Sequence, residues 1–166
     1  ARLAVDLKDP GLFIEYWKKP EVTRANRDER YFYTGDYAYA DQDGDIWFLG
    51  RKDDILNSFG YRISPHEIER VMKSCKGIEE CIACTEQLGE GKNIVVLLIV
   101  PKEHVTRAEL LNEVEYYAEE HLARYKCPKK FYWVSAFPKT ANGKIQRSLI
   151  RNELDTFVDR EGSLLD

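Results

Sequence analysis

The pattern of hydrophobic and polar positions changes character near residue 50. Before that point, short aromatic-rich runs predict strands at Ala1–Leu7, Tyr31–Tyr39 and Ile46–Leu49. Asp43-Gly44 separates the last two runs, and Asp-Gly between β-prone segments is a strong hairpin signal. We therefore expect a β-rich segment at 1–50.

After a short charged break at 51–54, the pattern predicts alternating strands and helices. A short hairpin is expected over Ile55–Ile63, with its turn between Asn57 and Gly60. Further strands are expected at Ile78–Thr85, Asn93–Val100 and Phe131–Val134. The second of these contains an unbroken apolar run, Ile94–Val100, which is typical of a fully buried strand.

Two sequence patterns predict where helices begin. Ser64 can cap a helix, Pro65 fits its first position, and Glu67 can complete a capping box. Thr106 and Glu109 form a second box before an apolar face at helical spacing that runs to about residue 122. A last helix is expected to begin near residue 147. Together these elements predict an α+β fold, with a short sheet flanked by helices in a small domain at 55–166.

Length and composition fit a small globular protein. The 166 residues suffice for one ordinary domain, or for a small domain and part of another. No apolar run approaches the roughly 20 residues that span a bilayer, so no membrane span is expected. Because the chain opens on a strand pattern rather than a charged leader, we expect a cut inside a longer cytoplasmic protein.

Two patterns superficially suggest metal sites, and neither meets the requirements. Cys81 and Cys84 have the spacing of zinc ligands, but no second pair follows, and residues three apart on a strand point to opposite faces. The acidic run Asp41–Asp45 lacks the Gly and Glu that an EF-hand loop needs at its sixth and twelfth positions. We expect no metal ligands in this chain and buried free thiols at the cysteines.

Charge is distributed unevenly along the chain. The whole sequence has a formal net charge of −4, yet residues 122–152 contain no acidic residue. The basic residues of this stretch are Arg124, Lys126, Lys129, Lys130, Lys139, Lys144, Arg147 and Arg151. Such a stretch attracts phosphates, which leaves three interpretations: a phosphorylated cofactor, a nucleic acid, or a solvated basic face without a specific partner.

Three segments of the chain carry short motifs. They are Tyr33-Thr34-Gly35-Asp36, then Gly50–Asp54 with Gly60–Ile63 and Glu67–Glu69, and finally Pro138–Arg147. In this order, and together with Leu122–Phe131, they resemble the late motifs of the adenylate-forming family. That family includes acyl-CoA synthetases, peptide-synthetase adenylation domains and luciferases.

The resemblance implies a two-step reaction with ATP, a carboxylic acid and CoA as substrates. The carboxylate first attacks the α-phosphate of ATP, which gives acyl-AMP and pyrophosphate, and a thiol then displaces AMP. Between the steps a small C-terminal lid domain would rotate on a hinge at Asp53, within residues 51–54. The main ATP site, the Mg²⁺ and the acyl pocket would belong to an N-terminal AMP-binding domain of the same chain, with residues 1–50 as its β-rich tail. We therefore expect residues 1–166 alone to be inactive.

For the first step, the resemblance places Lys144 at the active site. Asn142-Gly143 predicts a tight turn that presents this lysine away from the scaffold. An ammonium in that place stabilises the negative charge that develops on the phosphoryl oxygens. Asp36 and Arg51 match family positions that contact the ribose of the nucleotide.

For the second step, the resemblance implies a CoA-binding surface built around a turn. Its members are Phe59, Gly60, Tyr61, Arg62 and Lys126. Gly60 has no side chain and would let the pantetheine arm pass close to the backbone. Arg62 can pair with a phosphate of ATP or of CoA through its planar fork. Family members often have a small residue where this chain has Phe59.

The sequence therefore favours part of an ATP-dependent acyl-CoA synthetase of fatty acid metabolism. Gly11–Thr23 resembles the acetyl- and medium-chain-type synthetases. The alternative among enzymes is an adenylation domain that loads a carrier protein. A nucleic-acid-binding module at 122–152 would need base-stacking aromatic residues, and those present follow no RNA-recognition motif order. We expect no nucleic-acid partner.

Overall fold

A computed structural model describes residues 1–89 and 91–158. The chain divides into two compact units, with the boundary between Asp54 and Ile55. This boundary directly follows the charged break at 51–54, but the hinge role of these residues stays a prediction. None of the helices in the described part of the chain has the length and apolar character needed to cross a bilayer.

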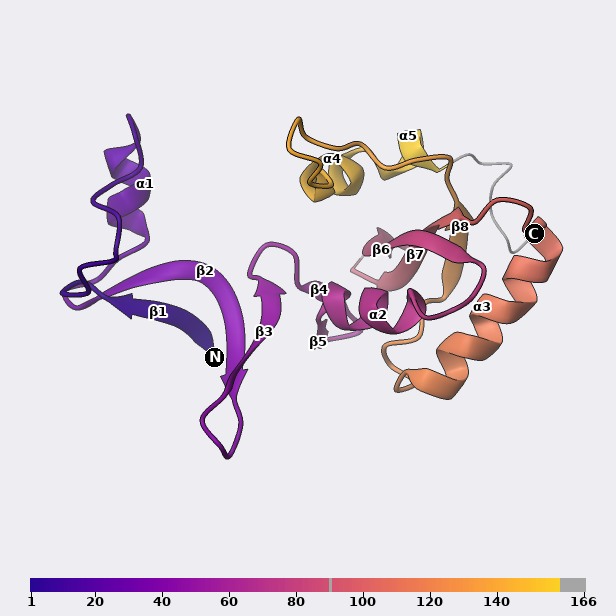
Figure 1. The fold of residues 1–166 in the computed structure, drawn as a ribbon, viewed down its shortest axis with the longest axis horizontal. Helices are drawn as coiled ribbons and strands as arrows, with labels where there is room; N and C mark the ends of the chain where they lie inside the picture. The colour runs from indigo at the N-terminus through magenta and orange to yellow at the C-terminus, as the bar shows by residue number, and fades with distance from the viewer. Residues whose placement is uncertain (90, 159–166) are drawn as a thin grey trace. The chain divides into compact units, whose positions relative to one another are not determined.

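The first unit contains an antiparallel sheet in the order β1-β2-β3 (Figure 1). Its strands are β1 (Arg2–Asp6), β2 (Tyr31–Ala40) and β3 (Ile46–Arg51), which confirms the three predicted strands. A short helix, α1 (Pro20–Ala25), lies between β1 and β2 in sequence. The hydrophobic pattern did not predict it, because six residues are too few to show a helical period.

The predicted turn at Asp43-Gly44 closes the β2–β3 hairpin. Gly44 has φ +88°, a conformation that favours glycine. Asp41 stabilises the turn, because its Oδ1 accepts the N–H groups of Asp43 and Asp45 at 3.1 and 2.9 Å. Its Oδ2 accepts the indole N–H of Trp47 at 2.6 Å. The Trp47 hydrogen bond is the main cause that lowers the pKa of Asp41, so the acidic run has a structural role in this turn.

The second unit is built around a three-stranded sheet in the order β6-β7-β8. β6 (Ile78–Gln87) and β7 (Asn93–Pro101) are antiparallel. The chain then crosses over through α3 (Arg107–His121) and returns as β8 (Lys130–Trp133), parallel to β7. The strands predicted near these positions are confirmed.

The remaining elements of the second unit surround this sheet. A hairpin of β4 (Leu56–Ser58) and β5 (Tyr61–Ile63) leads into α2 (Pro65–Met72). Two short helices, α4 (Arg147–Asn152) and α5 (Leu154–Phe157), follow β8. Figure 1 shows α2 and α3 on one side of the sheet and α4 with α5 on the other. The predicted α+β fold, a short sheet flanked by helices, is confirmed.

Both faces of the sheet are buried, because consecutive strand residues enter different cores. Leu97 of β7 packs in one core with Ile68 of α2 and Val114 of α3. Its neighbour Leu98 packs in the other core with Ile150 of α4. All five residues are fully buried, so the predicted burial of the apolar run in β7 is confirmed.

Cys81 and Cys84 point to opposite faces of β6, as predicted for strand residues three apart. Cys81 belongs to the core that contains Leu97, and Cys84 belongs to the core that contains Leu98. Both are free thiols, and burial, the main cause, raises the pKa of each to about 12. Buried neutral thiols of this kind behave as small hydrophobic side chains.

The two predicted capping boxes have different outcomes. Before α3, Thr106 Oγ1 accepts the N–H of Glu109 at 3.4 Å, and Glu109 Oε2 accepts the N–H of Thr106 at 3.1 Å, so this box is confirmed. α2 begins where predicted, but its box is wrong: in the described part of the chain, Ser64 makes no side-chain capping bond to the helix. The Glu67 carboxylate instead accepts a charge-assisted hydrogen bond from Lys126 Nζ at 2.5 Å.

Candidate functional site

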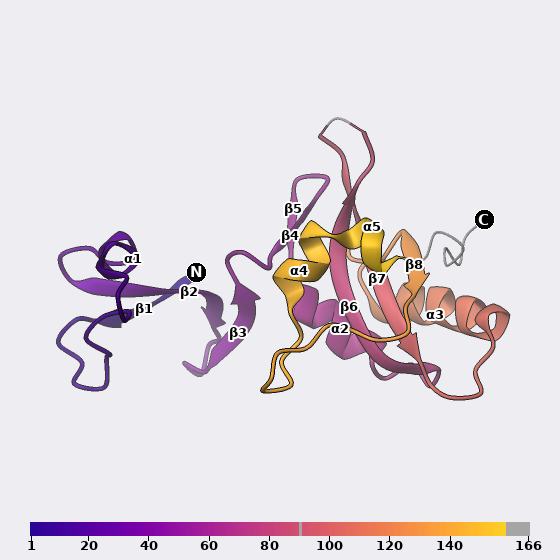
Figure 2. The ribbon, with the colours of Figure 1, turned by 90° about the horizontal axis from the view of Figure 1, so that it is seen from above.

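Lys144 lies in a loop that leaves β8, extends away from the sheet and returns into α4 (Figure 2). Lys139 and Ile145 pair across the loop as an isolated antiparallel bridge. Between them, the N–H of Thr140 donates to the Lys144 carbonyl at 2.8 Å, and Thr140 Oγ1 accepts the Lys144 N–H at 3.2 Å. Gly143 takes φ +77° at the turn. The predicted tight turn before Lys144 is therefore confirmed.

The side chain of Lys144 is exposed. Within residues 1–89 and 91–158, its ammonium makes no hydrogen bond or ion pair. A lysine on a flexible stem can bring this compact charge to a phosphate that approaches the loop. The Lys144 side chain is exposed on its loop, as the prediction requires. The catalytic role of Lys144 stays a prediction.

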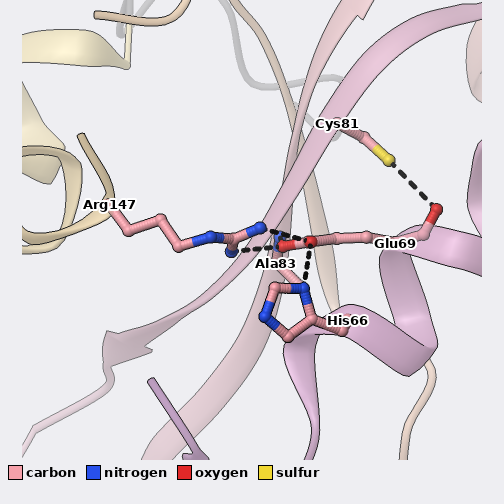
Figure 3. A network of polar contacts seen from close by, with 5 residues as sticks. All are labelled: His66, Glu69, Cys81, Ala83 and Arg147. Carbon is pink, nitrogen blue, oxygen red and sulfur yellow. Dashed lines mark hydrogen bonds and ion pairs between the residues drawn. The ribbon is translucent and has the colours of Figure 1, made fainter. Parts of the chain in front are cut away.

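The loop enters α4 at a buried ion pair that the sequence patterns did not single out. Arg147 Nη1 donates to Glu69 Oε1 at 2.7 Å, and Nη2 donates to Oε2 at 2.6 Å (Figure 3). Glu69 Oε1 also accepts the N–H of Ala83 at 3.0 Å, and His66 Nδ1 lies 3.6 Å from Oε2. Glu69 is the last residue of the second motif segment, and Arg147 is the last residue of the third. Their places at the ends of motif segments could have drawn attention to both residues.

The surroundings of Glu69 keep its carboxylate ionised. Burial by itself raises the pKa of Glu69, whose residue surface is only 6% exposed. The hydrogen bonds from His66 and Arg147, and the charge of Arg147, outweigh burial and hold the pKa below its ordinary value. An ionised carboxylate can accept both arms of the guanidinium fork at once.

The β4–β5 hairpin turns at Phe59 and Gly60, within the predicted range, while Asn57 and Ser58 belong to β4. Phe59 has φ +48° and Gly60 has φ +84°, and positive φ at both central residues is typical of a type I′ turn. This conformation is strained for phenylalanine, whose ring is nevertheless exposed. A Cβ added at Gly60 would meet no atom within 4 Å, so the space beside the turn is open.

Two predicted CoA-binding residues, Tyr61 and Lys126, come together beside this turn. The Tyr61 ring stacks on Tyr125 with 4.8 Å between ring centroids, and Lys126 Nζ lies 5.4 Å from the centroid of the same Tyr125 ring. The Lys126 side chain is 19% exposed, since Glu67 holds it. Arg62 is exposed on β5 and has no side-chain hydrogen bond or ion pair in the part of the chain that is described. CoA binding by these residues stays a prediction.

In the first unit, Asp36 and Arg51 face each other across β2 and β3. Arg51 Nε lies 3.9 Å from Asp36 Oδ1. Gly35 makes room for this arrangement, because a Cβ added there would lie 3.3 Å from Arg51 Nη2. Asp53 follows in an exposed turn. The structure thus brings the two predicted ribose contacts together, while ribose binding and the hinge role of Asp53 stay predictions.

Within residues 1–89 and 91–158, acidic residues from earlier elements bind at least four of the eight basic residues at 122–152. The pairs are Lys126–Glu67, Lys130–Glu86, Lys139–Glu80 and Arg147–Glu69. A nucleic-acid surface needs a face of clustered basic side chains that can reach phosphates. Because these four cations already have partners inside the unit, fewer basic side chains of this stretch are available to a nucleic-acid backbone, and the absence of a nucleic-acid partner stays a prediction.

The chain is similar to known enzymes in sequence and in structure. Residues 67–144 match the family model of the AMP-binding enzyme C-terminal domain. The chain is 34% identical over 146 residues to the mitochondrial acyl-coenzyme A synthetase ACSM1 of Mus musculus, and this match covers 86% of the chain and 26% of that protein. It is 36% identical over 150 residues to the uncharacterized acyl–CoA ligase YtcI of Bacillus subtilis (strain 168), covering 90% and 28%.

A solved structure gives the same result. The crystal structure of the anthranilate CoA ligase AuaEII, in complex with anthranoyl-AMP, matches with a TM-score of 0.81 and 28% sequence identity. This match covers 94% of the chain and 30% of that protein. The chain therefore spans about a quarter of the length of the curated relatives it matches.

Proposed function

Because the chain belongs to the adenylate-forming superfamily and carries its AMP-binding enzyme C-terminal domain at residues 67–144, we propose that it contains the lid of an ATP-dependent acyl-CoA synthetase. The complete protein would convert a carboxylic acid, ATP and CoA into acyl-CoA, AMP and pyrophosphate. The observation that carries this proposal is the placement of Lys144 and the Phe59-Gly60 turn as separate exposed sites of one compact unit. A lid that serves two successive steps needs two such sites.

In the first step, a carboxylate oxygen attacks the α-phosphorus of ATP, the bond from that phosphorus to the oxygen that bridges the α- and β-phosphates breaks, and pyrophosphate leaves. The oxygens on the α-phosphorus gain negative charge in the transition state. The ammonium of Lys144 stabilises this charge from its exposed turn. Asp36 accepts hydrogen bonds from the ribose hydroxyls, and Arg51 beside it supports the nucleotide.

In the second step, the thiol sulfur of CoA attacks the acyl carbon of acyl-AMP, loses its proton and displaces AMP. The open space beside Gly60 gives the pantetheine arm room to pass. Phe59 and Tyr61 offer aromatic surface next to it, while Arg62 and Lys126 supply positive charge for the phosphates of CoA. Rotation about Asp53 between the steps would replace Lys144 by the Phe59-Gly60 turn at the reacting groups.

The remaining parts of the reaction are assigned to an N-terminal AMP-binding domain of the same protein. It would hold the main ATP site, the Mg²⁺ and the acyl pocket; within the described residues, no group of three or more His, Cys, Asp and Glu side chains is placed to hold a metal ion. We propose that the substrate is a short- or medium-chain acid, and that the enzyme acts in the cytoplasm. An adenylation domain that loads a carrier protein is the alternative, and the names of the relatives favour CoA.

The test is Lys144→Ala in the full-length enzyme, measured separately in the two half-reactions. Loss of one preorganised charge at a developing oxyanion costs about 10²- to 10³-fold in rate, so acyl-AMP formation should fall by that factor. Conversion of supplied acyl-AMP to acyl-CoA should stay near the wild-type rate. Lys129→Ala removes another exposed lysine of the same basic stretch and should leave both rates unchanged. Equal loss in both half-reactions for Lys144→Ala would contradict the step-specific role.

A further inference from the structure

The direction in which Lys144 is presented must come from the backbone on either side of it. Its ammonium has no partner among residues 1–89 and 91–158, so no contact of its own side chain fixes it there. Inside the loop, the Gly143 N–H donates to the Thr140 carbonyl at 2.8 Å, and the Gln146 N–H donates to the Pro138 carbonyl at 2.9 Å. These bonds define the shape of the loop but do not connect it to the rest of the unit.

Among the described residues, two ion pairs connect the loop to the rest of the unit, one on each side, in addition to the packing of Ile145 against the core that contains Leu98. On the side of β8, Lys139 Nζ contacts Glu80 Oε1 at 2.8 Å, with side chains that are 42% and 30% exposed. On the side of α4, Arg147 forms its two-armed contact with Glu69, with side chains that are 23% and 8% exposed. A single exposed contact is weak and rotates easily, whereas a buried two-armed contact fixes the orientation of both partners.

The Glu69 contact is also held by three elements at once. The carboxylate, on α2, accepts the N–H of Ala83 on β6 in addition to both arms of Arg147 on α4 (Figure 3). His66, one helical turn before Glu69, lies against the second oxygen at 3.6 Å. The carboxylate therefore has contacts besides Arg147 that fix its orientation, and Arg147 lies only three residues after Lys144.

We propose that Glu69 and Arg147 are positioning residues that set the direction of the Lys144 loop for acyl-AMP formation. Replacing a buried ion pair by apolar side chains of similar size is often neutral for stability, so stability alone does not account for the pair. The planar guanidinium of Arg147 on a fixed carboxylate sets the orientation of the chain that leads to Lys144. Small errors in the position of a catalytic group lower the rate of the catalysed step. The inference rests on the proposed role of Lys144 in adenylation.

The experiment uses the full-length enzyme with Arg147→Lys, which keeps the charge and loses the fork, and Glu69→Gln, which keeps the shape and loses the charge. The matched control is Glu80→Gln, which removes the exposed contact on the other side of the loop. Hydrogen exchange of the Gly143 and Gln146 amides reports the loop directly, and the two half-reactions report function. We expect about tenfold faster exchange at these amides in Arg147→Lys and Glu69→Gln, with exchange in β7 unchanged.

In the same two variants, kcat for acyl-AMP formation should fall about tenfold or more, because Lys144 is misplaced. Conversion of supplied acyl-AMP should change by less than roughly twofold, and Glu80→Gln should change neither rate. Adding Arg147→Lys to Lys144→Ala should cost nothing further, because a residue that acts through Lys144 has no effect once Lys144 is gone.

Four outcomes decide whether Glu69 and Arg147 position the loop and whether Lys144 acts in acyl-AMP formation. Unchanged loop exchange in both variants overturns the positioning role, as does faster exchange across β6 and β7 with equal loss in both half-reactions. Faster loop exchange with normal acyl-AMP formation, while Lys144→Ala is also without effect, supports the mechanical connection and overturns the proposed role of Lys144. Faster loop exchange with a selective loss of acyl-AMP formation supports both.

Discussion

Glu67 and Glu69, two residues apart on α2, bind cations from two different candidate sites. Glu67 Oε1 contacts Lys126 Nζ at 2.5 Å beside the Phe59-Gly60 turn, whereas Glu69 contacts Arg147 below the Lys144 loop. Residues two apart on an α-helix are separated by about 200° around its axis, so they lie on nearly opposite sides. One short helix therefore supports the candidate sites for both steps, in directions that suit a lid with two orientations.

Breaking the buried pair should also have a cost in stability. Glu69→Ala leaves the Arg147 guanidinium without its partner, and removal of one member of a buried pair typically costs about 3 kcal/mol in the free energy of unfolding. Chemical denaturation of the purified chain measures this change. Glu80→Ala, at the exposed pair with Lys139, should cost well under about 1 kcal/mol. Equal costs for the two variants would show that burial does not distinguish the pairs.

The same carboxylate gives stability a predictable dependence on pH. The pKa of Glu69 is lowered from 4.5 in the folded chain, so the folded state holds this proton more weakly than the unfolded state. Its contribution is therefore fully present above pH 4.5 and is lost as the pH falls through the folded pKa. Denaturation midpoints measured from pH 6 down should fall less steeply below about pH 4.5 in Glu69→Gln than in the wild type. Parallel curves would contradict this assignment.

Gly60→Leu in the full-length enzyme should impair thioester formation and spare acyl-AMP formation. The new side chain would enter the open space beside the turn, where the thiol arm is proposed to pass. Separate assays of pyrophosphate exchange and of acyl-CoA formation measure the two steps. Gly44→Leu is the matched control, since Gly44 also has a positive φ and open space around its Cα. It should show the same backbone strain without the loss of thioester formation.

Phe59→Asn should stabilise the chain while weakening the second step. Asn followed by Gly is favoured in a type I′ turn, and relief of the strain at φ +48° is worth about 1 kcal/mol. Because the ring is 63% exposed, its removal loses little buried surface. Chemical denaturation measures the gain, and the Michaelis constant for CoA measures the loss of the aromatic contact. A less stable variant would show that the ring has a packing role after all.

The chain of residues 1–166, purified alone, should not release pyrophosphate from ATP with any carboxylic acid. It supplies Lys144 and the two proposed ribose contacts, but the phosphate cradle and the acyl pocket are assigned to the N-terminal domain. Pyrophosphate release above background by this chain would overturn that division of roles. Activity restored by adding the separate N-terminal domain would support it.

Much of the fold follows from local sequence patterns. The aromatic-rich run of β2, the unbroken apolar run of β7 and the box at Thr106 and Glu109 act through neighbouring residues, so the sequence predicted them correctly. The order of the motif segments likewise indicated the family and drew attention to Lys144. α1 was missed because it is too short to show a period.

Only the tertiary structure determined the ion pairs that support the candidate sites. Glu69 and Arg147 are 78 positions apart, and Glu67 and Lys126 are 59 apart, so no local pattern can pair them. The local pattern predicted a capping role for Glu67 because Ser64 stands three residues before it, but packing placed a lysine ammonium within its reach. Lys126 offers the Glu67 carboxylate a positively charged donor, whereas the capping box offers it only a neutral backbone N–H, so the distant partner is preferred. Local hydrogen bonds and hydrophobic periodicity depend on residues that are close in sequence. The partner of a charged side chain depends instead on which elements the folded chain brings together.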